Sequence, residues 1–136
     1  MAKPDLPPTN PPAVLIFDQI DWDNPMRSKS AVAPPKELVE KAKGSGARRK
    51  KIVNGEAGFF VNRSFLPPGF RVPPHHHTHD EMLVILEGGC EFDDGIAKLG
   101  ADDTIVIHAN YRYGFTCGPE GMEFLTIRMG DAGVSL

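Results

Sequence analysis

The histidines of this chain gather in one short stretch. Of five histidines in 136 residues, four fall within the segment Pro73-Pro-His-His-His-Thr-His-Asp-Glu81. Because alternate side chains of an extended strand share a face, one parity of this segment collects most of its candidate metal ligands. The residues of that parity are His75, His77, His79 and Glu81. Two imidazoles and one carboxylate on one face are a ligand set that suits Fe(II), Mn(II), Ni(II) or Zn(II).

A run of histidines can also be the remnant of a purification tag or a solvated loop. Here the run is internal, is interrupted by Thr78 and Asp80, and leads directly into the apolar stretch Met82–Leu86. These features argue against a tag. His76 has the opposite parity and is expected to face outward.

Turn-forming residues punctuate the chain and favour an all-β fold. The 14 glycines and 13 prolines make up about a fifth of the residues, which is typical of short strands joined by tight turns. One helix is expected at Pro34–Lys43, with Gly44 as its C-cap. The expected strands are Ala13–Phe17, Phe59–Leu66, Met82–Glu87, Cys90–Phe92, Ile96–Lys98, Thr104–His108 and Phe124–Met129. This pattern predicts a closed or two-sheet antiparallel β domain with one peripheral helix.

Length, charge and cysteine content exclude several classes of protein. The chain suits one compact domain, and its net charge of -3 gives no general attraction for nucleic acid. The longest apolar run, Met82–Leu86, is far shorter than the roughly 20 residues that span a bilayer, and no signal peptide is expected. Its 2 cysteines make no disulfide framework. We therefore expect a reduced, cytoplasmic protein with no nucleic-acid or membrane partner.

The spacing around the histidine cluster resembles a known family. The pattern Gly69, five residues, His75-x-His77, three residues, Glu81, six residues, Gly88 is similar to the first conserved motif of the cupin superfamily at every fixed position. The strand-turn-strand that follows has the length found between the two motifs of small bacterial cupins. The resemblance covers roughly residues 54–129. It implies a jelly-roll β-barrel in which His75, His77 and Glu81 hold a divalent metal.

The second cupin motif departs from the family pattern. His108 stands where proline is usual, Asn110 where glycine is usual, and Tyr113 where the family has a fourth metal ligand, a histidine. Asn tolerates the left-handed conformation, so the turn can be kept. Three roles are open for Tyr113: a phenolate ligand, an acid or base beside an open metal position, or the mark of a site without metal. We favour the second, and His108 is a further candidate ligand.

Other polar side chains near the expected site have simpler interpretations. His79 is expected at the rim of the barrel without a ligand role, and Arg63 and Arg112 are expected on the surface. Cys117 follows the second motif and is expected to be a buried core cysteine.

Within the resemblance, the best-matching function is a metal-dependent enzyme acting on a small organic molecule, with Tyr113 as its catalytic residue. Dioxygenase chemistry is the most common outcome for a lone small cupin, which makes Fe2+ the first choice of metal, ahead of Mn2+, Ni2+ and Zn2+. Cupin isomerase, lyase and cyclase reactions are alternatives, and so is a non-catalytic module that senses or stores a ligand. Metal binding needs neutral His75 and His77, so metal occupancy is expected to fall below about pH 6.

We divide the chain into four parts. Residues 1–12 form a proline-rich arm, residues 13–53 a strand, a helix and a basic loop, residues 54–130 the cupin barrel, and residues 131–136 a tail. The basic run Lys41–Lys51 is expected to be a solvated helix end and loop rather than an anion-binding surface. Small cupins usually dimerise, and an arm that crosses to a partner subunit would explain residues that the barrel does not need. We therefore expect a homodimer.

Overall fold

The computed structural model describes residues 10–22, 46–130 and 134–135, which consist mainly of β-strands and tight turns. In chain order the elements are η1 (Phe17–Gln19), β1 (Arg48–Asn54), η3 (Glu56–Gly58), β2 (Phe60–Leu66), β3 (Arg71–His77), β4 (Glu81–Phe92), η4 (Asp93–Gly95), β5 (Lys98–Gly100), β6 (Thr104–Ile107), β7 (Tyr113–Arg128) and β8 (Val134–Ser135). The helix expected at Pro34–Lys43 and most of the proline-rich arm lie outside the described residues. Within the described ranges, no helix is long and apolar enough to cross a membrane.

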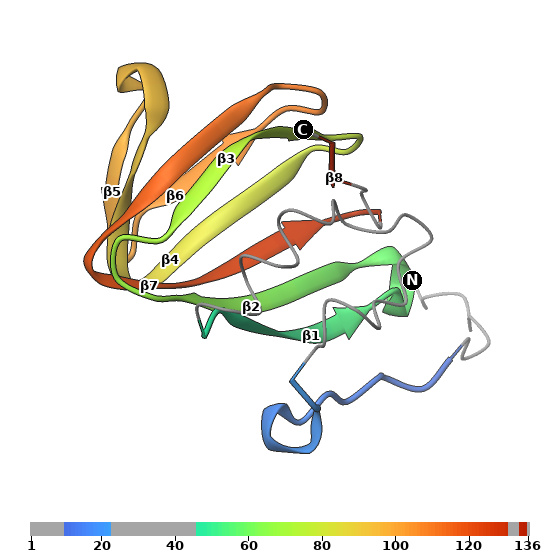
Figure 1. The fold of residues 1–136 in the computed structure, drawn as a ribbon. Helices are drawn as coiled ribbons and strands as arrows, with labels where there is room; N and C mark the ends of the chain where they lie inside the picture. Colours follow the sequence, from blue (N-terminus) through green and yellow to red (C-terminus); the bar gives the residue numbers. More distant parts are fainter. Residues whose placement is uncertain (1–9, 23–45, 131–133, 136) are drawn as a thin grey trace, which may run out of the picture.

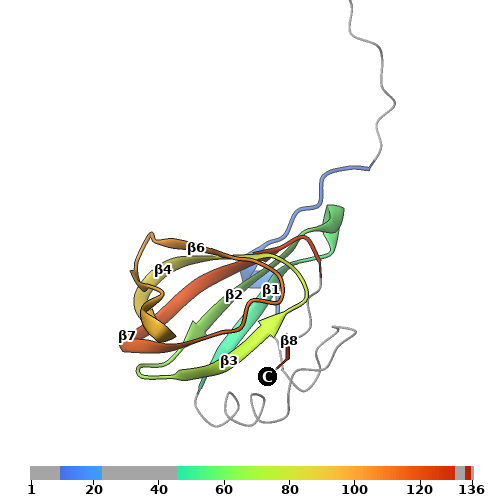
Figure 2. The ribbon, with the colours of Figure 1, turned by 90° about the horizontal axis from the view of Figure 1, so that it is seen from above.

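Two long strands, β4 and β7, organise the sheet. They pair antiparallel from Glu81 opposite Arg128 to Phe92 opposite Phe115. The C-terminal half of β7 also pairs with β2, which pairs with β1, whereas its N-terminal half pairs with β3. β4 pairs with β6 along its first residues and with β5 along its last. The strands form two layers (Figure 1; Figure 2), so the predicted antiparallel jelly roll is confirmed.

β4 continues through Gly88, where the sequence suggested that a strand ends. Gly88 has a φ of +72°, and a Cβ there would lie 2.1 Å from the carbonyl oxygen of Gly121. Gly121 has a φ of +74°, and a Cβ there would lie 2.5 Å from the carbonyl oxygen of Leu66. Only glycine fits where three backbones approach so closely. The β4–β7 register shifts at this point, so both strands bend instead of stopping.

The core lies on the inner face of the strands, defined here as the face that carries the buried side chains of β4 and β7. Its most deeply buried side chains are Leu83, Ile85, Phe92 and Met122. The Phe92 and Phe115 ring centroids lie 5.1 Å apart, and the centroid of Tyr113 lies 5.8 Å from that of Phe92. The apolar core therefore extends without a gap to Tyr113, where polar side chains begin.

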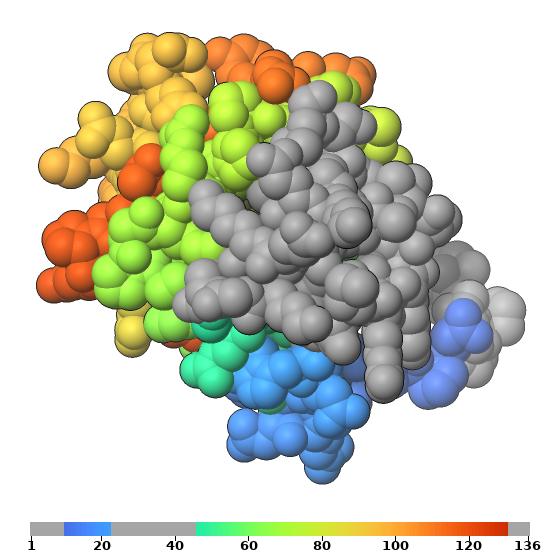
Figure 3. Space-filling view, in the orientation of Figure 1, coloured from blue at the N-terminus to red at the C-terminus, as the bar shows by residue number. Residues whose placement is uncertain are grey.

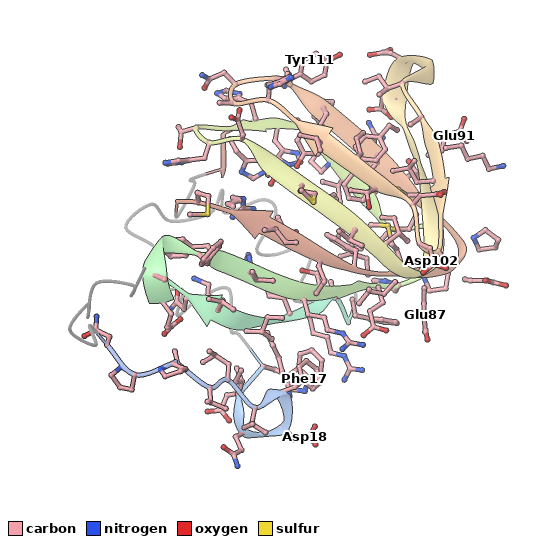
Figure 4. All side chains as sticks on the ribbon, turned by 180° about the vertical axis from the view of Figure 1, so that it is seen from behind. Phe17, Asp18, Glu87, Glu91, Asp102 and Tyr111 are labelled. Carbon is pink, nitrogen blue, oxygen red and sulfur yellow. The ribbon has the colours of Figure 1, made fainter. Side chains whose placement is uncertain are left out.

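The N-terminal segment differs from the expectation. Ala13–Phe17 was expected to be a strand, but the described chain has no strand there, and Phe17 begins η1. Val14 is 75% exposed, so the apolar run does not enter the core. Instead the segment lies against β1 (Figure 3), with the Lys50 ammonium 3.9 Å from the centroid of the Phe17 ring. Phe17 lies beside β1 and β2, far from Tyr111 at the opposite edge of the molecule (Figure 4).

Part of the basic run forms a strand, which corrects the expectation of a solvated loop. Arg48–Asn54 is β1, and Lys50 is buried because η1 covers it. The Lys50 ammonium donates a hydrogen bond to the carbonyl oxygen of Phe17 at 2.8 Å, and the Arg48 guanidinium lies 4.4 Å from the Trp22 ring centroid. Cations over aromatic rings are stabilised by the ring quadrupole. These basic residues therefore attach the N-terminal segment to the outer face of the sheet.

Candidate functional site

Four residues singled out from the sequence meet on the inner face. β3 carries His75 and His77, β4 begins at Glu81, and β7 begins at Tyr113. All four are buried, with exposed fractions between 3% and 6%. The structure thus brings together the three predicted metal ligands and the predicted catalytic residue.

The chain is not extended from His75 to Glu81, as the parity argument assumed. β3 ends at His77, and a bend at Thr78 and His79 separates it from β4. The bend brings Glu81 back beside His77, so that His77 Nε2 and Glu81 Oε1 lie 3.5 Å apart. His79 has the predicted parity but is exposed, with its Nδ1 3.1 Å from Thr78 Oγ1. The chain reversal, rather than a single strand face, therefore selects which residues meet.

The loop before β7 is fixed against this bend. The Ala109 N–H donates to Asp80 Oδ1 at 2.7 Å, and the Asn110 N–H donates to the His77 carbonyl oxygen at 2.7 Å. Asn110 has a φ of +66°, as expected for a residue that replaces glycine in the turn. His108 is 88% exposed, with its Nδ1 3.9 Å from Asp80 Oδ1, and the structure does not bring it to the cluster.

Tyr113 lies at the centre of the cluster. Its hydroxyl donates a hydrogen bond to Glu81 Oε1 and lies 3.2 Å from His77 Nε2. His75 is opposite Tyr113 on the neighbouring strand, and the two ring centroids are 4.5 Å apart. Burial, followed by the charge of Glu81, raises the pKa of Tyr113 well above its ordinary value near 10. The phenol therefore keeps its proton at neutral pH and acts as a hydrogen-bond donor.

His75 is held in one tautomer. Its Nδ1 lies 2.8 Å from the carbonyl oxygen of Pro73, and because a carbonyl only accepts, Nδ1 carries the proton and Nε2 the lone pair. Burial is the main cause that lowers the pKa of His75 below 6.5, so the ring is neutral at pH 7. A neutral imidazole held by a backbone carbonyl is the form in which histidine binds metals.

Arg128 is a fifth member of the cluster, and the sequence reasoning missed it. Its Nε donates to Glu81 Oε2 at 3.0 Å, and the two side chains are only 11% and 1% exposed. Arg128 stands opposite Glu81 in the β4–β7 ladder. The alternation of the last strand could have identified it. Phe124, Thr126 and Arg128 share one parity, and Phe124 is an apolar residue expected in the core. A period of two therefore places Arg128 on the inner face.

The remaining polar candidates lie elsewhere or have structural roles. Asn62 is buried on the inner face. Arg63 pairs with Glu123, with its Nε 2.8 Å from Glu123 Oε1, while Arg112 is exposed. Arg71 binds both carboxylate oxygens of Asp93, at 2.6 and 2.5 Å, which ties β3 to η4. Cys117 is buried, as expected.

The donor set fits a divalent metal in its chemistry. It offers two imidazoles and a carboxylate, and the 3.5 Å between His77 Nε2 and Glu81 Oε1 is about the edge of a tetrahedron with metal–ligand distances of roughly 2.1 Å. Among the described residues, however, no three His, Cys, Asp or Glu side chains are gathered closely enough to hold a metal ion. Glu81 gives one oxygen to Tyr113 and the other to Arg128. A metal would therefore compete with the Tyr113 hydroxyl for Glu81.

Comparisons with known proteins agree with this fold. Residues 62–128 match the family model of the cupin domain. A search of curated protein sequences finds no match to the chain.

Three solved structures illustrate the likeness. An RmlC-like cupin from Shewanella frigidimarina is 17% identical, with a TM-score of 0.59 over 83% of this chain and 86% of that one. KdgF from a Halomonas species is 16% identical, with a TM-score of 0.61 over 85% and 93%. The polyketide cyclase RemF from Streptomyces resistomycificus is 20% identical, with a TM-score of 0.60 over 85% and 78%. At these identities the likeness shows the fold alone.

The family match lies within the part of the molecule that forms the jelly roll. The span 62–128 begins in β2, ends at Arg128 and contains every residue of the inner cluster. Its strands form the jelly roll, and its first histidine motif lies where β3 turns into β4. Residues 62–128 therefore form a cupin domain.

Proposed function

We propose that this protein is a metal-dependent enzyme that moves a proton on a small organic molecule. The observation that carries the proposal is the position of Tyr113, whose buried hydroxyl lies between Glu81 Oε1 and His77 Nε2. A neutral phenol bonded to a carboxylate pairs a proton donor with a proton acceptor. Acid–base chemistry is the function that this arrangement supports best.

Each residue of the network has its own role in the proposal. The Glu81 carboxylate is the group that accepts a proton from the substrate, and the neutral Tyr113 phenol is the group that donates one. The hydrogen bond between them then returns the proton from Glu81 Oε1 to the phenolic oxygen. Arg128 holds Glu81 through Oε2, which keeps the other oxygen directed at Tyr113. Phe92 and Phe115 pack against Tyr113 and keep water from its ring.

His75, His77 and Glu81 are the residues that would hold the metal. A divalent metal supplies Lewis-acid polarisation of a substrate oxygen, which makes a neighbouring C–H bond more acidic. At such a carbon the Glu81 carboxylate would take the proton and the Tyr113 phenol would return one. Isomerase, lyase and cyclase reactions all contain such a step.

The donor types favour a second candidate, a dioxygenase-like oxidoreductase. Two histidines and one carboxylate are the ligands of many Fe(II) oxygenases. In that case Fe2+ would be the metal and O2 a co-substrate. A non-catalytic cupin that binds or senses a ligand is the third possibility, and it predicts retention of metal or ligand without turnover.

Metal content is the first test of the proposal. Untagged protein and a His75→Ala, His77→Ala double variant are incubated with Fe2+, Mn2+, Ni2+ or Zn2+, desalted and measured by inductively coupled plasma mass spectrometry. We expect near-stoichiometric metal in the wild type and loss in the variant. A His79→Ala, His108→Ala variant is the matched control, because both histidines are exposed outside the cluster. Wild-type protein that takes up none of the four metals would contradict the metal part of the proposal.

The reaction class is tested with a panel of 1,3-diketones and 2-oxo acids in D2O. We expect the metal-loaded wild type to exchange hydrogen for deuterium on carbon, as followed by NMR, and Tyr113→Phe to do so at least about a hundredfold more slowly. The control is Tyr111→Phe, which changes the exposed tyrosine. Oxygen consumption without exchange would favour the dioxygenase, and neither activity would favour the binding module.

A further inference from the structure

We propose that Arg128 recognises a carboxylate group of the substrate, so that the substrate is an anionic small molecule. This inference deepens the proposed function and rests on it for the position of the reacting atoms. The inference is based on the two terminal guanidinium nitrogens of Arg128, which do not contact Glu81.

Among the described residues, only one of the three guanidinium nitrogens of Arg128 has a hydrogen-bond partner. Nε donates to Glu81 Oε2, whereas Nη1 and Nη2 have no hydrogen-bond partner among the described residues. In the same residues, no completely buried side-chain nitrogen or oxygen lacks a partner. The terminal nitrogens therefore reach solvent-accessible space, although the side chain is nine-tenths buried. Their N–H groups form the flat edge that binds carboxylates.

Two further polar side chains lie next to this edge. Thr126 is two residues before Arg128 on the same face of β7, and Asn62 is directly opposite Thr126 on β2. Both residues are buried, and within the described chain neither side chain has a hydrogen-bond partner, so by the same argument their polar atoms are not completely enclosed by protein. Diagonal neighbours across strands lie roughly 7–8 Å apart. The strand register thus sets the Asn62 amide and the Thr126 hydroxyl beside Arg128 as candidate further contacts for a small molecule.

The charge of the site favours an anion. Glu81 balances the charge of Arg128, and a divalent metal on His75 and His77 would leave the cluster with net positive charge. A carboxylate reduces that charge and binds both terminal nitrogens in parallel, whereas a cationic ligand is repelled. Glu81 contacts Arg128 through one oxygen and Tyr113 through the other. A carboxylate on Arg128 thus brings the next carbon atoms of the same molecule towards the Tyr113 hydroxyl.

Arg63 offers a matched control for the test. It also pairs through Nε with a glutamate, Glu123, at 2.8 Å, but it is 36% exposed and lies near Phe17 on the outer face. Arg63→Lys changes the same chemical groups as Arg128→Lys and leaves the inner face untouched.

The test is an NMR titration of 15N-labelled protein with benzoate and succinate, and with the uncharged analogues benzamide and succinamide. We expect the carboxylates to shift the Arg128 Nε–H and Asn62 side-chain signals and to bind about tenfold or more tightly than the amides. Arg128→Lys should weaken carboxylate binding by about tenfold or more, because lysine keeps the charge but lacks the two-nitrogen edge. Arg63→Lys should leave the affinity within about twofold.

Metal content measured in the same samples separates this inference from the proposed function. Carboxylate binding at Arg128 in protein that takes up no metal would refute the metal proposal and support the inference. Equal affinity for carboxylates and amides, or unchanged carboxylate affinity in Arg128→Lys, would overturn the inference whether or not metal is present. If Arg128→Lys does not fold, the wild-type shifts decide, and shifts that leave Arg128 and Asn62 unaffected overturn it.

Discussion

The inner and outer faces of the sheet each carry one arginine–glutamate pair joined through Nε. On the inner face Arg128 pairs with Glu81 at 3.0 Å, and on the outer face Arg63 pairs with Glu123 at 2.8 Å. The distances are similar, but the surroundings differ. The inner side chains are 11% and 1% exposed, and the outer ones 36% and 23%.

This difference shows that the nitrogen–oxygen distance of an ion pair says little about its contribution to the free energy of unfolding. Water and salt screen the outer pair, whose contribution to stability is about 0–1 kcal/mol. Burial of the inner pair removes water from both charges, and their attraction does not always repay that loss. Stability alone therefore gives no reason for a charged pair in this core, whereas the role that we propose for Arg128, holding Glu81 and a ligand, would give one.

The largest expected effect is on the free energy of unfolding when each arginine is replaced. Arg128→Gln should lower it by about 3–5 kcal/mol, because Glu81 is left charged and buried without its partner. Arg63→Gln should lower it by at most about 1 kcal/mol. Urea unfolding measures both variants. Equal losses would remove the contrast between the faces, and addition of Glu81→Gln to Arg128→Gln should restore part of the inner loss.

The two tyrosines sharpen the same contrast. Tyr113→Phe removes a buried hydroxyl that donates to Glu81 and should lower the free energy of unfolding by about 1.5–3 kcal/mol, whereas Tyr111→Phe should change it by at most about 0.5 kcal/mol. In Tyr111→Phe protein, absorbance at 295 nm reports Tyr113 alone.

The pKa of Tyr113 is raised in the folded state, so the unfolded chain loses this proton first as the pH rises. Stability from this group is therefore complete below about pH 10 and decreases above it. We expect no Tyr113 phenolate signal near pH 10 in the folded protein. A Tyr113 titration midpoint near pH 10 would show that water reaches the inner face more than its burial implies.

The thiols of the inner face should react far more slowly in the folded than in the unfolded protein. Burial raises the pKa of Cys90 to about 11 and, together with the charge of Cys90, that of Cys117 to about 12. At pH 8 the thiolate fraction is then more than about a hundredfold below that of an exposed cysteine. Labelling with Ellman's reagent, with and without urea, measures the ratio of rates. Similar rates in both conditions would contradict a closed inner face.

The smallest expected effect lies on the outer face. Phe17→Ala removes the ring over the Lys50 ammonium and should lower the free energy of unfolding by about 1 kcal/mol. Val14→Ala, at an exposed position of the same segment, is the control and should change it by less than about 0.5 kcal/mol. A loss for Phe17→Ala as large as for Arg128→Gln would show that the N-terminal segment is part of the core.

The sequence predicted most of the fold because its strand and turn signals are local. Thr104–His108 and Phe59–Leu66 match β6 and β2 to within a residue. Asn110 adopts the left-handed conformation that its place in the motif required. Ala13–Phe17 was misassigned because an apolar run forms a strand only if a neighbouring strand pairs with it, and β1 takes that place beside β2.

The candidate site was foreseen only in part, since its members come from separate strands. Motif spacing grouped His75, His77, Glu81 and Tyr113, which the structure brings together, and their role as metal ligands and catalytic residue remains a prediction. Arg128 joins Glu81 from 47 residues away in the chain. Such a pair depends on the register between β4 and β7, which no short motif encodes. Homodimer formation through the proline-rich arm also remains a prediction.

The pairing of Glu81 with Arg128 has a consequence for local opening of the sheet. These residues form the last rung of the β4–β7 ladder, and the ends of ladders open more readily than their middles. Here the two side chains of that rung are joined to each other, and Glu81 is also joined to Tyr113. Occupation of the site should therefore slow amide hydrogen exchange first at the neighbouring rung, Met82 and Ile127. Protection should then decline along β4 towards Gly88. Ligand binding at one end of the barrel would thus lower the amide hydrogen exchange rates along β4 and β7, its longest pair of strands.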